Sequence, residues 1–97
     1  MVYFIVLVNI KSVENRKEYD DYIIKVKPII EKYGGKYIVR SENITALCDK
    51  LQKPDRIIII QWEDKKQLLN CFNSKEYIMI KNKRENSVES KAFIVEA

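Results

Sequence analysis

The amino-acid sequence predicts an α+β fold in which four strands form one antiparallel sheet and the helices cover one face of it. Two observations predict this fold. Four short segments are rich in apolar and β-branched residues, and amphipathic helical segments separate them in the order β-α-β-β-α-β. This is the split βαβ, or ferredoxin-like, order. The 97 residues contain no linker and no low-complexity stretch, so we expect a single domain over residues 1–97.

The four predicted strands are short apolar runs bounded by polar or turn residues. They cover residues 2–8, 36–41, 56–62 and 91–96. The third run contains four consecutive isoleucines. A loop over residues 42–55 joins the second strand to the third, and it has room for a short element near residues 44–47.

The first helix is expected to begin after Asn15, which has capping-box spacing to Glu18. Its apolar stripe repeats at helical spacing and consists of Tyr19, Tyr22, Ile23, Val26, Ile30 and Tyr33. Pro28 lies inside this pattern, so we expect a bend near residues 24–28 rather than a break. Gly34 and Gly35 end the helix, because glycine readily adopts the left-handed conformation of a C-cap.

The second helical segment is expected in two pieces. Asp64, with Gln67 three residues later, has the spacing of an N-cap, and the apolar residues that follow are Leu68, Leu69 and Phe72. Ser74 then looks like a fresh N-cap, so the sequence predicts a break at Asn73.

Both faces of the predicted sheet are apolar. In the first strand Tyr3, Ile5 and Leu7 alternate with Phe4, Val6 and Val8, and the third and last strands repeat this pattern. Helices can cover only one face. The other, roughly 400 Å² for four strands of about six residues, is at the limit of what a monomer leaves exposed.

Pairing two such faces buries apolar surface worth on the order of 20 kcal/mol of favourable free energy. The loss of translational and rotational freedom on association costs roughly 4–15 kcal/mol. We therefore expect a homodimer that packs sheet to sheet. The alternative is that the loop over residues 42–55 folds over the open face, but this loop is rich in polar residues.

The composition argues against several classes of function. The net charge is +4, but the 18 basic residues are scattered among 14 acidic ones, which does not favour nucleic acid as a partner. The basic-glycine-aromatic strand of RNA-binding ferredoxin-like folds is also missing. The chain has no histidine and no glycine-rich phosphate motif, so we expect neither a metal nor a cofactor.

The first predicted strand and the two cysteines bear on the cellular compartment of the protein. Residues 2–8 lack the basic flank and the cleavage site of a signal peptide, and they are too short to span a bilayer. Cys48 and Cys71 are isolated thiols without a disulfide framework or a neighbouring base. We expect a cytoplasmic protein with no membrane partner, in which both thiols are inert packing residues.

Two arginines are the candidate ligand-binding cations. Arg84 falls on the helical stripe of Tyr77 and Ile80, and Arg40 shares a strand face with Ile38. A guanidinium near a core needs an acid, water or a bound anion. Arg40 therefore pairs with Glu42 or Glu63, or it holds a ligand carboxylate or phosphate, and the same alternatives apply to Arg84. The aromatic residues Tyr22, Tyr37, Trp62 and Tyr77 are either core residues or walls of a pocket.

An ordered set of short motifs resembles a known family. The segments GGKYIVR, RIIIIQW, SKEY and AFIVEA, together with Arg84, are similar to those of an uncharacterised bacterial family of the dimeric α/β-barrel superfamily. The resemblance implies two ferredoxin-like subunits packed sheet to sheet. The wider superfamily includes cofactor-free monooxygenases and small isomerases, whose substrates bind in a cleft between each sheet and its helices.

The sequence departs from the family pattern at three places: Arg40-Ser41-Glu42, Leu47-Cys48-Asp49 and Gln61-Trp62-Glu63. Two carboxylates that are usual in the family are Cys48 and Gln61 here. A proton transfer that depends on either one is therefore not expected, and no catalytic residue is assigned.

The predicted function is binding of a small, anionic organic molecule in an aromatic cleft. The candidate ligand-binding residues are Arg40, Tyr77, Arg84, Tyr22, Tyr37 and Trp62. Monooxygenase-like or isomerase-like chemistry is one possibility that the resemblance raises. The alternative is a non-catalytic dimer that binds a metabolite or a partner protein.

Overall fold

The structure has the predicted order of elements. It is a computed structural model and describes residues 1–48, 50 and 52–97. The elements are β1 (Val2–Ile10), α1 (Val13–Lys32), β2 (Lys36–Ser41), β3 (Arg56–Trp62), α2 (Lys65–Phe72), α3 (Lys75–Ser87) and β4 (Val88–Glu96). β2 and β3 have the predicted bounds. β1 and β4 are longer than predicted, because their ladder continues to the pair Ile10–Val88. Residues 44–47 form no helix or strand.

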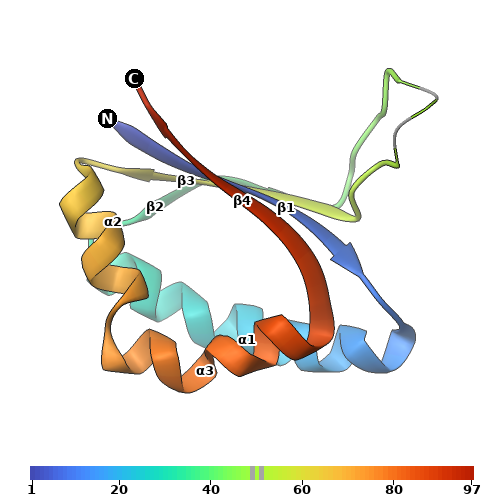
Figure 1. The fold of residues 1–97 in the computed structure, drawn as a ribbon, viewed down its shortest axis with the longest axis horizontal. Helices are drawn as coiled ribbons and strands as arrows, with labels where there is room; N and C mark the ends of the chain where they lie inside the picture. The colour runs from blue at the N-terminus through green and yellow to red at the C-terminus, as the bar shows by residue number, and fades with distance from the viewer. Residues whose placement is uncertain (49, 51) are drawn as a thin grey trace.

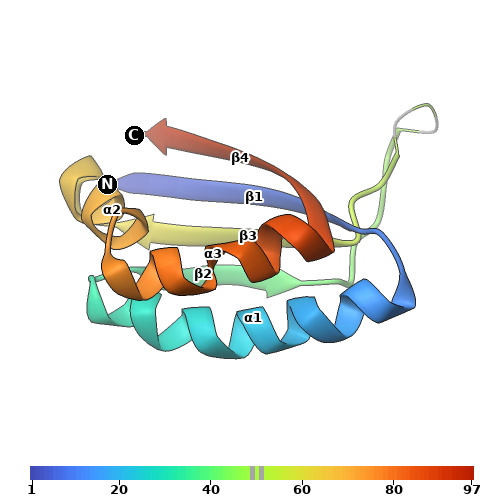
Figure 2. The same cartoon turned by 60° about the horizontal axis from the view of Figure 1, so that its bottom comes forward.

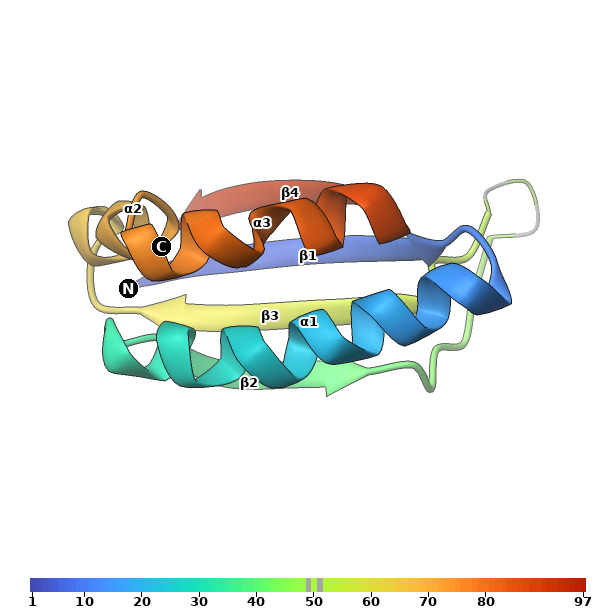
Figure 3. The ribbon, with the colours of Figure 1, turned by 90° about the horizontal axis from the view of Figure 1, so that it is seen from below.

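The four strands form one antiparallel sheet in the order β2-β3-β1-β4. All helices of the described chain lie on one face of this sheet (Figure 1). Seen from the helix side, α1 lies over β2 and β3, and α3 lies over β1 and β4 (Figure 3). The two termini lie side by side at one end of the sheet (Figure 2). The ferredoxin-like prediction is confirmed.

The first helix begins earlier than predicted. Ser12 is its N-cap, with an extended backbone and a hydroxyl that accepts the N–H of Asn15 at 3.2 Å. The side chain of Asn15 accepts the Ser12 hydroxyl at 2.8 Å in return. The prediction of Asn15 as the cap was therefore wrong. Ser12 lies three residues earlier and satisfies the first free donors of the helix, which leaves Asn15 inside the first turn.

The other predicted helix boundaries are confirmed. α1 continues through Pro28 without a break, and Gly34, with φ of 94°, follows its C-cap. Asp64 caps α2 by accepting the N–H of Gln67 at 2.8 Å. Ser74 caps α3 by accepting the N–H of Tyr77 at 3.2 Å, and Asn73 separates the two helices.

The strand residues that face the helices form the core. The buried apolar residues of the strands are Val2, Val6, Val8, Ile60, Trp62 and Val88. They pack against Tyr19, Tyr22, Val26 and Ile30 of α1 and against Leu68, Cys71 and Tyr77 of the other helices. Burial of these side chains on one face follows the alternation along each strand.

An irregularity in β2 changes the face of Arg40. The register of β2 against β3 shifts between Tyr37 and Val39, so that Tyr37 pairs with Ile60 and Arg40 pairs with Ile58. Tyr37 and Arg40 therefore lie on the same side of the sheet, facing the helices. The predicted grouping of Arg40 with Ile38 was wrong, because a β-bulge breaks the period of two.

The opposite face of the sheet, which we call the open face, carries no helix in the described chain. Its apolar residues are Tyr3, Ile5, Leu7, Val39, Ile57, Ile59, Phe93 and Val95. The exposed fractions of Phe93 and Val95 are 53% and 45%. The described part of the loop between β2 and β3 extends from the end of the sheet instead of lying over this face (Figure 1). This placement speaks against the alternative in which the loop covers it.

Candidate functional site

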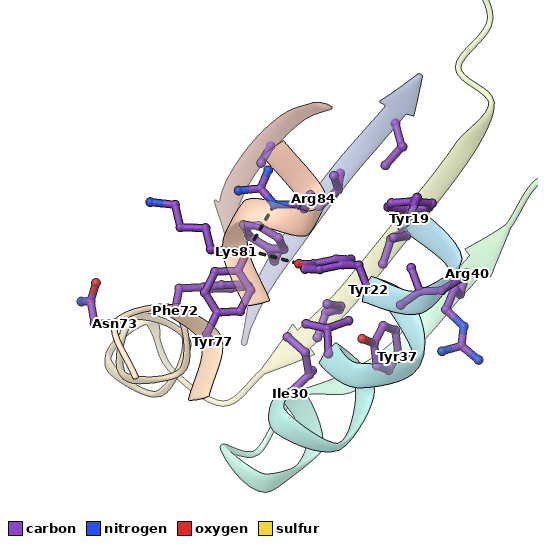
Figure 4. Close-up of a pocket in the computed structure, with 18 residues that line it drawn as sticks. Tyr19, Tyr22, Ile30, Tyr37, Arg40, Phe72, Asn73, Tyr77, Lys81 and Arg84 are labelled. Atoms are coloured by element: carbon purple, nitrogen blue, oxygen red, sulfur yellow. Dashed lines mark hydrogen bonds between the residues drawn. The ribbon is translucent and has the colours of Figure 1, made fainter. Parts of the chain in front are cut away.

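A cavity of about 320 Å³ lies between the helix-covered face of the sheet and the helices. Its apolar lining comes mainly from Phe4, Val6, Val8, Ile23, Val26, Ile30, Ile58, Ile60, Phe72 and Ala92. Its polar lining comes from Tyr19, Tyr22, Tyr37, Arg40, Asn73, Tyr77, Lys81 and Arg84 (Figure 4). Among the described residues, no carboxylate lines it. The cavity therefore combines an apolar body with cations and hydroxyl groups.

Arg84 and two tyrosines form a hydrogen-bonded chain along the cavity wall (Figure 4). The Nε of Arg84 donates to the hydroxyl of Tyr77 at 3.2 Å, and the hydroxyls of Tyr77 and Tyr22 are 3.1 Å apart. The Nη1 of Arg84 donates to the hydroxyl of Ser90 at 2.9 Å. Tyr77 and Arg84 lie two turns apart on α3, whereas Tyr22 reaches them from α1.

Within the described residues, one hydroxyl hydrogen of the Tyr77–Tyr22 pair has no acceptor. Tyr77 accepts from Arg84, so the contact between Tyr77 and Tyr22 uses the hydrogen of only one of the two hydroxyls. The other hydroxyl keeps its hydrogen for a further acceptor. Because a guanidinium donates into the chain, that hydrogen is polarised and suits an anionic or carbonyl oxygen.

The surroundings of Tyr22 and Arg84 shift the pKa of each side chain. Burial raises the pKa of Tyr22, and the neighbouring Tyr77 raises it further, so that Tyr22 remains a neutral donor. Burial disfavours the charge of Arg84, but Tyr77 and Tyr22 favour it, and the net effect raises the pKa of Arg84. No carboxylate of the described residues lies within ion-pair distance of Arg84. This part of the cavity wall thus presents the half-buried guanidinium of Arg84 beside hydroxyl donors.

Arg40 lies at the edge of the cavity and does not make the predicted ion pair. Its guanidinium carbon is 5.1 Å from the centroid of the Tyr37 ring, and its side chain extends away from Tyr22 and Arg84 (Figure 4). Burial raises the pKa of Tyr37 to about 12. Glu42, one of the two acids predicted to pair with Arg40, is held instead by Arg16 through two contacts of 2.6 Å.

The structure brings together five of the six predicted site residues. Arg40, Tyr77, Arg84, Tyr22 and Tyr37 line the cavity, whereas Trp62 does not. Trp62 is 1% exposed and packs under Gly35, where an added methyl group would lie 2.9 Å from its ring. The absence of a side chain at Gly35 is what allows this indole to fill the core next to the end of α1.

Sequence reasoning did not select three other polar lining residues, Tyr19, Asn73 and Lys81. Tyr19 appeared as one member of the apolar stripe of α1, and its hydroxyl gave no separate signal. Lys81 follows Tyr77 by one turn of α3, so its helical spacing was a usable signal. Asn73 lies at the break between α2 and α3, where the sequence shows a turn but not its direction.

The described residues offer no metal site and no disulfide. They contain no group of three or more Cys, Asp or Glu side chains placed to hold an ion. Cys48 is an exposed free thiol and Cys71 a buried one. Within the described part of the chain, none of the helices has the length and apolar character needed to cross a membrane.

Comparisons with known proteins give the family and the fold. The family model "Domain of unknown function (DUF1330)" matches residues 1–97, so the chain belongs to this family. A search of curated proteins found no match. A protein of unknown function from Rhodopseudomonas palustris has a similar structure, with a TM-score of 0.81 and 14% identity over 99% of this chain and 81% of that one.

Two further solved structures are similar. A dimeric ferredoxin-like protein of unknown function from Jannaschia sp. CCS1 has a TM-score of 0.76 and 8% identity, over 99% of this chain and 98% of that one. SnoaB, a cofactor-independent oxygenase from Streptomyces nogalater, has a TM-score of 0.71 and 11% identity, over 99% of this chain and 91% of that one. At these identities the likeness establishes the fold.

Proposed function

We propose that this DUF1330 chain forms a homodimer through the open faces of its sheets, and that each subunit binds a small organic acid in the cavity between sheet and helices. The acidic group contacts Arg84 and the free hydroxyl hydrogen of the Tyr77–Tyr22 pair. The apolar part of the ligand contacts residues such as Phe72 and Ile30. The two free thiols suit a reducing compartment, so we place the protein in the cytosol.

Arg84 is the observation that carries the ligand proposal. It is half-buried in the cavity wall, and its partners among the described residues are two neutral hydroxyls, those of Tyr77 and Ser90. A half-buried guanidinium is normally compensated by an acid. A ligand carboxylate would supply the missing charge and could accept two parallel hydrogen bonds from the planar guanidinium.

The open face supports the dimer. The face covers roughly 400 Å², and burial of two such faces contributes on the order of 20 kcal/mol gross, which exceeds the roughly 4–15 kcal/mol that association costs. The fold is shared with a dimeric ferredoxin-like protein from Jannaschia. Since the cavity lies on the other side of the sheet, this association leaves the ligand site uncovered.

Arg84→Met tests the ligand site. We expect small aromatic acids such as phenylacetate and benzoate to raise the melting temperature of the wild type, and Arg84→Met to abolish this shift. The variant itself should lose about 1–3 kcal/mol of stability, because it loses two hydrogen bonds to neutral partners. Differential scanning fluorimetry and isothermal titration calorimetry measure both effects.

Lys83→Met is the matched control. Lys83 is the preceding residue on α3 and pairs with Asp21 at 2.9 Å, outside the cavity lining. This variant should keep the response to acids. A wild type that no organic acid stabilises, or an Arg84→Met variant that responds as well as the wild type, would refute the proposed site.

Catalysis is a second candidate, and the shared fold of the cofactor-independent oxygenase SnoaB favours it. The described lining residues include no carboxylate, and the chain has no histidine, so a general base in the cavity would have to be Lys81 or a tyrosine. Oxygen consumption and product analysis with the acids that bind distinguish a catalyst from a binding protein.

A further inference from the structure

Tyr19 has a buried hydroxyl in the cavity wall that the Arg84 chain does not use. It lies one turn before Tyr22 on α1, and the two rings are nearly parallel, at 21°, with centroids 6.0 Å apart. Tyr19 is 2% exposed, and its hydroxyl has no hydrogen-bond partner among the described residues. A buried hydroxyl without a partner is rare and destabilising. Its position in the cavity lining makes a ligand atom a natural partner.

Arg56 makes this position favourable for an acceptor. It lies at the start of β3, is 7% exposed, and its Nε has no hydrogen-bond partner among the described residues. Its contact with Glu42 is long, at 3.5 Å, and Arg16 already holds both oxygens of that carboxylate at 2.6 Å. Positive charge at Arg56 is therefore only partly compensated.

The sheet register connects Arg56 and Arg84 through Val8 of β1, which has Arg56 beside it on β3 and Ser90 beside it on β4. Arg56 pairs with Val8, and Val8 pairs with Ser90, which accepts a hydrogen bond from Arg84. Tyr19 and Val8 both line the cavity there. Burial raises the pKa of Tyr19, and the charge of Arg56 is the largest influence that opposes this rise, so Tyr19 remains a neutral donor. Arg56 does not itself line the cavity, but its charge, partly offset by Glu42, favours an acceptor near the Tyr19 hydroxyl.

We propose that Tyr19 determines ligand specificity by donating a hydrogen bond to a second oxygen of the bound molecule. This inference rests on the proposed function, because it concerns the same cavity. The preferred ligands are organic acids with an apolar body and one additional acceptor, such as a hydroxy, keto or second carboxylate group. The acid contacts the Arg84 chain, and the additional oxygen contacts Tyr19.

Tyr19→Phe tests this inference with matched probes. Phenylacetate, 3-hydroxyphenylacetate, 4-hydroxyphenylacetate and 2-carboxyphenylacetate share one body and differ in the additional oxygen. We expect at least one substituted acid to bind the wild type about fivefold or more tightly than phenylacetate, as one hydrogen bond allows. Tyr19→Phe should remove this gain and leave the dissociation constant of phenylacetate within about twofold, a change below one hydrogen bond.

Tyr33→Phe is the control for the same chemical change outside the cavity. Tyr33 donates to Glu76 at 3.1 Å and does not line the cavity, so its variant should keep the gain. Without ligand, Tyr19→Phe should melt at or above the wild-type temperature, because the hydroxyl that it loses has no partner among the described residues.

The outcomes separate this inference from the proposed function. A gain that persists in Tyr19→Phe, or substituted acids that bind no better than phenylacetate, would overturn the role of Tyr19 while Arg84-dependent binding stands. A marked fall in the melting temperature of ligand-free Tyr19→Phe would also overturn it, because the hydroxyl would then have a structural partner. Failure of every acid to bind the wild type would instead refute the proposed function, and this inference with it.

Discussion

At the scale of single residues, the two cysteines should differ sharply in reactivity. Cys71 is 0% exposed, and its thiol lies 4.0 Å from the carbonyl oxygen of Ile29. Burial raises the pKa of Cys71 to about 12, and the charge of Glu76 adds to this effect. Cys48 is exposed. We expect an aromatic disulfide reagent at pH 8 to label one thiol per chain rapidly and the second only as the protein unfolds.

Single-cysteine variants assign the two phases. Cys48→Ser should remove the rapid phase, and Cys71→Ser should remove the slow one. In 6 M guanidinium chloride both thiols should react at once, since unfolding removes the burial. Two rapid thiols in the native wild type would contradict the buried position of Cys71.

The site residues were predictable to the extent that helical spacing determines them. Tyr77 and Arg84 share a face of α3 because they are two turns apart after the Ser74 cap, and the Nε of Arg84 donates to the hydroxyl of Tyr77 at 3.2 Å. Spacing did not show that this partner is a neutral hydroxyl and not the expected acid, water or bound anion. The face of Arg40 depends on a bulge, which strand periodicity cannot show. The Tyr19 hydroxyl has no hydrogen-bond partner among the described residues, and this could not be predicted, because it depends on which groups surround the hydroxyl in three dimensions.

At the scale of elements, the boundaries set by local contacts were predicted best. Asp64 and Ser74 each accept an N–H three residues later, a spacing visible in the sequence. The same rule selected Asn15 in place of Ser12, because two capping residues compete within one turn. The early start of β4 was missed, since Val88 pairs with Ile10 at the far end of the chain and this pairing is long-range.

Ser74 should contribute more to stability than an ordinary cap, because it joins two helices. Its hydroxyl accepts the N–H of Tyr77 at 3.2 Å and donates to the carbonyl of Cys71 at 2.6 Å, and the residue is 9% exposed. We expect Ser74→Ala to lower the free energy of unfolding by about 2 kcal/mol, at the upper end for caps. The exposed cap variant Ser12→Ala should lose about 1 kcal/mol.

Urea denaturation measures the free energy of unfolding of Ser74→Ala and Ser12→Ala. The dependence of this free energy on urea concentration should be the same in both variants if their unfolded states are alike. Asn15→Ala should cost less than Ser12→Ala, since Asn15 contributes a side-chain contact but not the cap. A larger loss in Asn15→Ala than in Ser12→Ala would restore Asn15 as the cap. A Ser74→Ala variant as stable as the wild type would contradict the prediction that Ser74 stabilises the connection between α2 and α3.

At the scale of the whole molecule, the sheet separates two surfaces with different properties. The helix-covered side encloses the cavity with its two arginines and its tyrosines. The open side presents apolar residues with no covering element in the described chain (Figure 1). Because these surfaces lie on opposite sides of one sheet, a change on the open face should alter assembly while the residues that line the cavity keep their positions.

Ile59→Lys tests assembly at the centre of the open face. Ile59 lies on β3 and pairs with Ile5 on one side and Val39 on the other, so that a charge there would be buried between two sheets. Burial of an unpaired ammonium costs several kcal/mol, enough to offset much of the net association energy. Light scattering after gel filtration at micromolar concentration should show the wild type at twice the chain mass of 11.5 kDa and the variant at that mass.

Met79→Lys provides the control, because Met79 lies on α3 away from the open face and is already 84% exposed. It adds the same charge and should remain a dimer. The monomeric Ile59→Lys variant should still be stabilised by the acids that bind the wild type, since Arg84 and Tyr77 lie on the other side of the sheet. A wild type that is monomeric at micromolar concentration would contradict the dimer and show that an apolar face of roughly 400 Å² can remain exposed in this fold.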